Sequence, residues 1–303
     1  MIVALTGATG FVGHAVLDEA ARQGAEVRAL TRRAQAARPG VEWIEGNLGD
    51  SAALTKLVAG SDAVIHVAGL THTLVPADFE AANVAGTQAL IDAARGAGVT
   101  RFVFTSSLSA REPSLSAYGA SKARAEVLVA ASGLDWVTVR PPGVYGPRDV
   151  DYFEMFRTAK RGFVPLPPPG ATSMIYVADL ARLLLALASA PSDAVRAKVF
   201  EPDDGAKGGW SHKALAREIG RSVGRRVFAP HLPKAVMTGA ARADRLIRGD
   251  KARLTIDRVG YMTHPGWVVD PARAVPPEVW QPEVAVPEGL SRTADWYRRQ
   301  GWL

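Results

Sequence analysis

Three residues have the types and spacing for acid–base chemistry on a carbonyl or alcohol. Tyr118 and Lys122 stand four residues apart, and Ser107 precedes Tyr118 by eleven residues. Residues four apart share a face of a helix, so the phenol and the ammonium are predicted to be neighbours. An ammonium favours the phenolate and makes tyrosine a usable proton donor and acceptor. Ser107 is expected to orient the substrate oxygen, with Ser106 as the competing candidate.

A glycine-rich segment near the start of the chain predicts a dinucleotide site. It places glycines at 7, 10 and 13, directly after an apolar run and at the opening of a helical pattern. Such glycines allow a tight turn, a close approach of pyrophosphate to the backbone and close helix–sheet packing. The helix N-terminus offers unpaired N–H groups to phosphate. The predicted cofactor-binding residues of this loop are Gly7, Thr9, Gly10, Phe11, Val12 and Gly13.

The residues after the second apolar run favour NADP(H) over NAD(H). An acidic residue there would bind the adenosine ribose, but the chain has Thr31, Arg32 and Arg33 instead. Two guanidinium groups suit a 2′-phosphate, because they form charge-assisted bonds with it. The alternative is that Arg32 and Arg33 are solvated surface residues, in which case NAD(H) remains possible.

Short apolar runs that alternate with helical patterns predict the scaffold. This order is typical of βαβ units, so we expect an α/β fold with a Rossmann-type doubly wound parallel sheet. Prolines and glycines after Arg140 predict a transition to a smaller α+β domain. The expected division is 1–148 for NADP binding and 149–303 mainly for the substrate. The return of later segments to the sheet is left open. The expected strands are 2–5, 26–30, 41–44, 63–67, 101–105, 136–139 and 198–201, and the expected helices are 12–23, 77–97, 117–131 and 287–300.

Composition narrows the classes of function. The 303 residues are 48% hydrophobic and 22% charged, which is typical of a globular enzyme. The chain has no cysteine, and its six histidines show no metal-ligand spacing, so no metal is expected. The net charge is +6, but acids alternate with the basic residues, and we expect no nucleic-acid partner. No run is apolar for the roughly 20 residues that span a bilayer, so we expect a cytoplasmic protein without a membrane partner.

The ordered motifs resemble the extended short-chain dehydrogenase/reductase family, which includes NAD-dependent epimerases and dehydratases. Besides the glycine loop and the Tyr118/Lys122 pair, the resemblance rests on the segments 46–50, 66–69, 83–87, 140–148, 175–180 and 288–297. It implies that Asn47 and Leu48 lie by the adenine, Ala68 and Gly69 by the pyrophosphate and ribose, and Pro141 and Val144 near the nicotinamide. The family usually has aspartate where Asn47 stands. It also implies a homodimer that pairs the helices 77–97 and 117–131.

The resemblance leaves three hypotheses open. The favoured one is an NADP(H)-dependent oxidoreductase that interconverts a small or medium apolar ketone or aldehyde and its alcohol, with Tyr118 as acid and base. Members that act on nucleotide sugars hold the diphosphate with asparagine and arginine, where this chain has Gly143 and Thr172. An epimerase or dehydratase of a sugar derivative is therefore the alternative, and a non-catalytic NADPH-binding assembly or regulatory protein is the second. The residues expected to line an apolar substrate pocket are Phe153, Phe156, Phe163, Met174 and Trp210.

Overall fold

The computed structural model describes residues 1–252 and 254–303, which form two compact units. The first unit comprises Met1–Pro141, Ala178–Pro202 and Pro271–Gln281, and the second comprises Pro142–Val177, Asp203–Asp270 and Pro282–Leu303. The chain therefore leaves the first unit after Pro141, seven residues before the boundary that the sequence suggests, and two later segments return to it.

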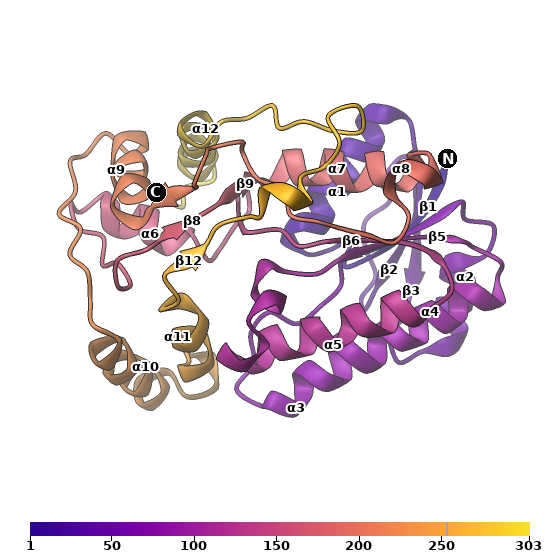
Figure 1. The fold of residues 1–303 in the computed structure, drawn as a ribbon, viewed down its shortest axis with the longest axis horizontal. Coiled ribbons are helices and arrows are strands. Elements are labelled where there is room, and N and C mark those ends of the chain that lie inside the picture. Colours follow the sequence, from indigo (N-terminus) through magenta and orange to yellow (C-terminus); the bar gives the residue numbers. More distant parts are fainter. Residues whose placement is uncertain (253) are drawn as a thin grey trace. The chain divides into compact units, whose positions relative to one another are not determined.

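A parallel sheet forms the centre of the first unit (Figure 1). Its strand order is β10-β6-β5-β4-β1-β2-β3, and each neighbouring pair is parallel. The central strands are almost completely buried, as expected when helices cover both faces of a sheet. The strands are β1 (Ile2–Thr6), β2 (Glu26–Thr31), β3 (Val41–Glu45), β4 (Ala63–His66), β5 (Arg101–Thr105), β6 (Asp135–Val139) and β10 (Lys198–Phe200).

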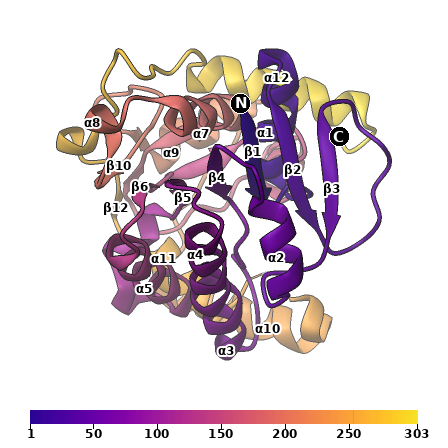
Figure 2. The same ribbon diagram turned by 90° about the vertical axis from the view of Figure 1, so that its right-hand side faces the viewer.

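Helices cover the two faces of this sheet, which confirms the predicted doubly wound fold (Figures 1 and 2). One face carries α2 (Ser51–Val58), α4 (Gly86–Gly96) and α5 (Ala117–Ala131), which pack on a core that includes Leu54, Leu90 and Phe102. The other face carries α1 (Phe11–Gln23) and α7 (Val177–Ser189), whose leucines are buried. In the described part of the chain, no helix is long and apolar enough to cross a bilayer.

The segment expected to be one helix over 77–97 contains an irregularity. It consists of α3 (Pro76–Phe79), a π-helical turn η1 (Glu80–Ala85) and α4. The wider turn carries Asn83, which is buried. Such turns are often found at functional sites because they re-aim a side chain. Short 3₁₀ turns, η2 (Leu108–Arg111) and η3 (Pro113–Leu115), connect β5 to α5, and α8 (Ser192–Val195) and η5 (Pro271–Arg273) complete the unit.

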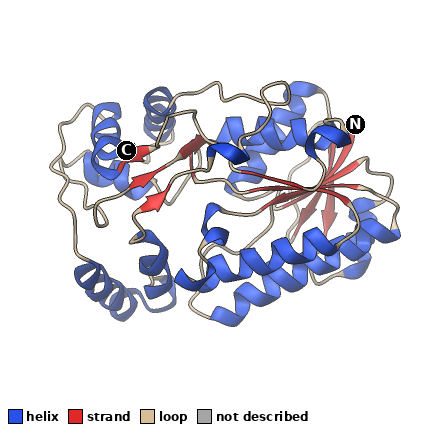
Figure 3. Cartoon of the chain, viewed as in Figure 1, coloured by secondary structure: helices blue, strands red, loops and turns tan. Residues whose placement is uncertain are grey.

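The second unit combines small sheets with helices (Figure 3). One sheet pairs β7 (Gly143–Tyr145) with β9 (Met174–Tyr176), and the other has β8 (Ala171–Thr172) between β11 (Trp210–Ser211) and β12 (Gly266–Trp267). The helices α6 (Phe153–Ala159), α9 (His212–Ser222) and α12 (Val286–Arg299) enclose its core. The remaining helices are α10 (Lys234–Arg248), η4 (Gly249–Lys251) and α11 (Ile256–Met262).

Candidate active site

The glycine turn between β1 and α1 is sterically restricted to glycine at two positions. Gly7 has a φ of +75°, and a Cβ there would lie 2.7 Å from the Ala68 nitrogen. A Cβ on Gly13 would lie 2.0 Å from the Gly7 oxygen. The N-cap residue of α1, Gly10, offers no side chain to the first N–H groups of the helix. This arrangement fits a dinucleotide, because the missing side chains leave backbone N–H groups accessible to a pyrophosphate.

The turn also brings distant predicted cofactor segments together. Ala68 donates its N–H to Thr6 Oγ1 at 3.1 Å, so the segment after β4 lies against the end of β1. A Cβ on Gly69 would lie 3.6 Å from Lys122 Nζ and 3.2 Å from Asn83 Oδ1. The predicted pyrophosphate-ribose segment is therefore next to the predicted catalytic lysine.

The end of β2 presents both arginines to solvent. The Thr31 hydroxyl donates to the Arg33 carbonyl at 2.7 Å, which shapes the turn, and both arginine side chains are exposed. The Thr31 carbonyl accepts the Gly46 N–H at 2.8 Å, which holds the next predicted segment beside it. There, Asn47 Oδ1 accepts the Gly49 N–H at 2.8 Å.

Leu48, which is predicted to lie by the adenine, packs against the start of the helix α4. A Cβ on Gly86 would lie 2.8 Å from Leu48 Cδ1, so a larger residue at 86 would displace the Leu48 side chain. This contact explains why a glycine occurs within the segment 83–87. It also fixes Leu48 at the carboxyl end of the sheet, where dinucleotides bind in doubly wound folds.

Lys122 is buried on α5 with its ammonium at the end of β5. Its Nζ donates to the Thr105 carbonyl at 2.7 Å and lies 4.4 Å from the centre of the Phe104 ring. Burial lowers the pKa of Lys122 to about 7, and the charge of Glu126, one turn along the helix, partly opposes this shift. The lysine is thus held in place by the strand that directly precedes the candidate serines.

Tyr118 lies near the start of the same helix and is half-buried, with its ring 5.9 Å from that of Phe79. Ser116 caps the helix by accepting the Gly119 N–H at 2.9 Å. Gly119 is needed because a Cβ there would lie 2.7 Å from the Ser109 oxygen. The close approach of α5 to η2 brings the predicted tyrosine and serine segments together.

Ser107 directly follows the end of β5 and caps η2. Its Oγ accepts the Ser109 N–H at 3.2 Å and the Ser109 hydroxyl at 2.9 Å. Since both contacts use Ser107 as an acceptor, its own hydroxyl hydrogen is directed elsewhere. Ser106 differs, because it is buried and its hydroxyl donates to Glu126. This geometry favours Ser107 over Ser106 as the residue that donates to a substrate oxygen.

Comparisons with known proteins place this geometry in a family. A family model described as NAD(P)H-binding matches residues 7–191. Ceramide reductase of Caulobacter vibrioides is 34% identical over 100% of this chain and 96% of its own length. The 2-alkyl-3-oxoalkanoate reductase of Stenotrophomonas maltophilia is 30% identical, with 96% and 98% covered. The chain belongs to the extended short-chain dehydrogenase/reductase family.

Solved structures agree at the level of the fold. The structure of gox2253 has a TM-score of 0.78 at 22% identity and covers 100% of this chain and 99% of its own. MoeE5 in complex with UDP-glucuronic acid and NAD has a TM-score of 0.76 at 23% identity, with 99% of both chains covered. As a member of this family, the protein is an NAD(P)-dependent enzyme with a nicotinamide cofactor.

A buried polar chain connects the strands of this dehydrogenase/reductase to α5. Thr87 Oγ1 donates to the Asn83 carbonyl at 2.7 Å and so accepts from His66 Nε2, at 2.9 Å. His66 Nδ1, 2.6 Å from Thr6 Oγ1, is then the acceptor of a neutral ring. Burial, reinforced by the charge of Lys122, lowers the pKa of His66 to about 3. His66 is therefore a neutral, hydrogen-bonded residue of the core.

Asn83 completes this connection from the π-helical turn. Its Nδ2 donates to the Leu70 carbonyl and to Ser121 Oγ, both at 2.9 Å, and its Oδ1 accepts the Leu70 N–H at 2.7 Å. Ser121 in turn donates to the Tyr118 carbonyl at 2.7 Å. Asn83 thus ties the segment after Gly69 to the helix that carries Tyr118 and Lys122.

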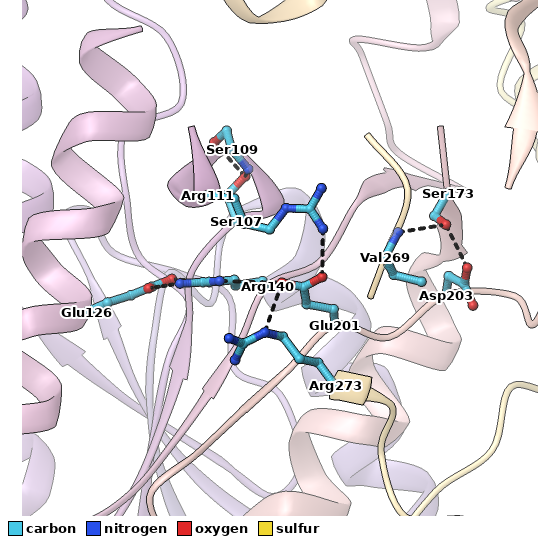
Figure 4. Close-up of polar contacts among 10 residues, drawn as sticks. All are labelled: Ser107, Ser109, Arg111, Glu126, Arg140, Ser173, Glu201, Asp203, Val269 and Arg273. Atoms are coloured by element: carbon cyan, nitrogen blue, oxygen red, sulfur yellow. Dashed lines mark hydrogen bonds and ion pairs between the residues drawn. The ribbon is translucent and has the colours of Figure 1, made fainter. Parts of the chain in front are cut away.

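A network of arginines and glutamates supports the end of β5 (Figure 4). Arg140 forms a bidentate pair with Glu126, with Nε–Oε1 at 2.9 Å and Nη2–Oε2 at 2.6 Å. Its Nη1 also lies 3.4 Å from Glu201 Oε1. Glu201, whose side chain is fully buried, additionally pairs with Arg111 at 3.0 Å and with Arg273 at 3.8 Å.

Glu126 and Glu201 are not singled out by the sequence motifs. Glu126 follows Lys122 by four residues, so the spacing Tyr118, Lys122, Glu126 on one helix face is a signal that can reveal it. Glu201 comes from a different segment, and its partners lie 61 or more residues away in sequence. No local pattern indicates such a cluster.

The remaining predicted residues are divided between the two units. Pro141 ends the first segment of the first unit and accepts the Leu108 N–H at 3.0 Å, whereas Val144 belongs to β7 of the second unit. Of the five expected pocket residues, Phe156 and Met174 are fully buried in the core of the second unit, and Phe153 and Trp210 pack against it. Phe163 is exposed. Four of the five side chains are therefore used for packing within the second unit, and their role as a common pocket lining stays a prediction.

Proposed function

We propose that the protein is an NADPH-dependent reductase that converts an apolar ketone or aldehyde into its alcohol, reversibly. The observation that carries the proposal is whole-length similarity to two proteins named as reductases. The substrates in their names, ceramide and a 2-alkyl-3-oxoalkanoate, are molecules with apolar chains. The presence of Ser107, Tyr118 and Lys122 around the end of β5 supports the same chemistry.

The proposed roles follow from the geometry of the three residues. The bound nicotinamide supplies the hydride that reaches the carbonyl carbon. Ser107 donates its hydroxyl hydrogen to the substrate oxygen, since its acceptor capacity is used by Ser109. Tyr118 transfers its phenolic proton to that oxygen as the alcohol forms, and solvent returns a proton to the phenolate. Lys122 stabilises this phenolate, and its anchor on Thr105 fixes where its charge lies.

NADPH is proposed as the preferred cofactor because of Arg32 and Arg33. Both are exposed immediately after β2, where the adenosine ribose of a dinucleotide binds in this fold. Charge-assisted bonds from guanidinium groups favour the extra phosphate.

A specific packing contact disfavours nucleotide sugars as substrates. At position 143, where sugar-nucleotide members have asparagine, a Cβ would lie 2.4 Å from the Tyr152 hydroxyl and 2.8 Å from Met174 Sδ. The Tyr152 hydroxyl donates to that sulfur at 3.4 Å, so a side chain at 143 would displace a buried contact. The Thr172 hydroxyl, at the position of the family's arginine, donates to the Ser173 carbonyl at 3.0 Å. Neither position provides a diphosphate ligand.

The test is consumption of NADPH with a panel of long-chain and short-chain ketones, 3-oxo esters and UDP-sugars. We expect turnover with apolar ketones and at least a roughly hundredfold loss in Tyr118→Phe, because general acid catalysis contributes at least that factor. NADPH affinity should persist in this variant. Equal activity of Tyr118→Phe would exclude the assigned acid, and interconversion of sugars without net NADPH consumption would favour the epimerase.

A further inference from the structure

The helix α10 exposes an apolar face. Its inner side packs Met237 and Ala241 against Val259 of α11 in a small hydrophobic cluster. The opposite side is also apolar, and Leu246 and Ile247 are 86% and 81% exposed. Residues three and four apart share a helix face, so the exposed residues form a continuous stripe. The outer stripe consists of Val236, Gly239, Ala240, Ala243, Leu246 and Ile247.

Arg242 borders this outer stripe next to Gly239 and Leu246, and Arg245 lies beside Arg242, between the stripe and the buried side of the helix. Arg242 and Arg245 are exposed and have no carboxylate partner within 1–252 and 254–303, whereas Arg248 pairs with Asp244 at 3.2 Å. Residues 225–258 contain nine Lys or Arg and three Asp or Glu. Their net charge of +6 equals that of the whole chain. The positive excess is therefore concentrated here, which corrects, for this segment, the expectation that acids alternate with the basic residues.

A second apolar feature lies in the same unit and has the same composition. Phe163 and Phe228 are 42% and 71% exposed, and their rings lie 6.2 Å apart. Each follows two exposed basic residues, which are Lys160 and Arg161 in one segment and Arg225 and Arg226 in the other. Exposed aromatic and aliphatic side chains beside cationic groups are the composition of protein faces that lie on lipid headgroups.

We propose that α10, with its outer stripe and bordering arginines, binds the surface of an anionic lipid bilayer. The apolar side chains enter the boundary between headgroups and acyl chains, and Arg242 and Arg245 pair with lipid phosphates. A second copy of the chain fits this face less well, because symmetric docking would bring both arginine clusters together. Within residues 1–252 and 254–303 no helix is long and apolar enough to span a bilayer, but this observation does not bear on a helix that lies in the interface plane. The proposal therefore departs from the expectation that the protein has no membrane partner.

The inference stands apart from the proposed reductase function, since neither α10 nor its arginines belong to the candidate active site. The experiment therefore measures binding to vesicles in the absence of cofactor and substrate, so that failure of one proposal leaves the other intact.

The test is co-flotation of the full chain with vesicles of phosphatidylcholine, with and without phosphatidylglycerol. We expect binding to the anionic vesicles that weakens with salt, because exposed charge interactions are screened. Leu246→Ser/Ile247→Ser should reduce binding at least about tenfold, and Arg242→Gln/Arg245→Gln should remove the preference for phosphatidylglycerol. Val75→Ser is a matched control for an exposed apolar residue, and Arg299→Gln for an exposed arginine.

Circular dichroism and thermal melting of each variant check that α10 remains folded. Failure of the wild-type chain to float with anionic vesicles would overturn the proposal. So would equal flotation of the Leu246→Ser/Ile247→Ser variant and Val75→Ser. A solution dimer that this double variant dissociates, without vesicle binding by the wild type, would assign the face to a second copy instead.

Discussion

Arg32 and Arg33 are the side chains on which the proposed preference between two cofactors that differ by one phosphate depends. The Thr31 hydroxyl donates to the Arg33 carbonyl and shapes the turn that carries them, and the proposed role of the two side chains rests on their charge. A hydrogen bond to a charged group contributes about 1.5–3 kcal/mol, which corresponds to roughly tenfold to hundredfold in affinity.

We therefore predict that Arg32→Ala/Arg33→Ala raises the KM for NADPH by about tenfold to hundredfold and leaves that for NADH nearly unchanged. Steady-state kinetics with NADPH and with NADH measure the change in each KM. Arg38→Ala is a suitable control, because Arg38 is an arginine of the same β2–β3 connection that pairs with Asp18 at 2.9 Å. A parallel loss for both cofactors would show that the arginines act on folding or on a shared phosphate.

His66 shows how a buried polar residue makes stability depend on pH. In the folded protein its pKa is about 3, whereas an unfolded histidine titrates near about 6.5. Between these values the unfolded chain binds a proton that the native protein does not. The resulting loss of stability is about 1.4 kcal/mol per pH unit as pH falls through this window.

The prediction is that the free energy of unfolding of the wild type falls by about 2 kcal/mol from pH 6.5 to pH 5 through His66 alone. His66→Gln, which cannot gain a charge, should lack this part of the slope although it is less stable near pH 7. Urea unfolding of both proteins at several pH values provides the comparison. Identical slopes would mean that His66 is protonated in the native state.

At the scale of elements, the charge network links a helix to the end of a strand. Glu126 on α5 receives the Ser106 hydroxyl and the Arg140 guanidinium, and it also favours the charged form of Lys122. Lys122 interacts electrostatically with Glu126 on the same helix. It also interacts with His66 on β4 when the imidazole of that residue is protonated. Glu126 is thus a positioning residue that acts through Lys122 and Ser106.

Replacing Glu126 by glutamine should move the pH profile of the reaction. Without the carboxylate, the pKa of Lys122 falls further, and the charged lysine that stabilises the Tyr118 phenolate is lost at a lower pH. We expect the alkaline limb of kcat to shift to lower pH, with little change in KM for NADPH. Glu126→Asp should restore part of the profile, whereas a uniform loss at all pH values would indicate a purely structural role.

The elements that the sequence predicts best are those with local signals. β5 and α5 have the predicted bounds because an apolar run and a helical pattern are each closed by polar residues or glycine. The π-helical turn at Glu80–Ala85 was not predicted. It coincides with hydrogen bonds that Asn83 exchanges with the Leu70 backbone and donates to Ser121 Oγ. Periodicity does not report such tertiary contacts.

The candidate site likewise contains residues that local sequence patterns predict and residues that depend on tertiary contacts. The glycine turn and the Tyr118/Lys122 pair are visible as spacings, and the structure brings their segments together at Gly69. The roles of these residues remain predictions. Local sequence patterns could not predict the role of Glu201. Its side chain becomes buried only when β10 pairs with β6, and the chain passes through the second unit before it reaches β10.

At the scale of the whole molecule, α4 and α5 lie side by side on one face of the sheet (Figures 1 and 2). The outer side of α5 carries Val127, which is 67% exposed, together with exposed Ala130 and Ala131. Small side chains permit close helix packing, so this surface suits the four-helix homodimer that the family resemblance implies. Because a symmetric interface places each substituted residue in both copies, one substitution acts twice.

Val127→Glu/Ala131→Glu should therefore weaken the dimer by at least about tenfold in Kd, because it replaces apolar contact with charge in a buried interface. Sedimentation equilibrium over a range of concentrations measures this change. Leu246→Ser/Ile247→Ser is the matched control, since it alters an equally exposed apolar surface on α10 and should leave the mass unchanged. A wild-type chain that stays monomeric at high concentration would refute the four-helix interface, and dissociation by the α10 variant alone would place the contact on the other unit.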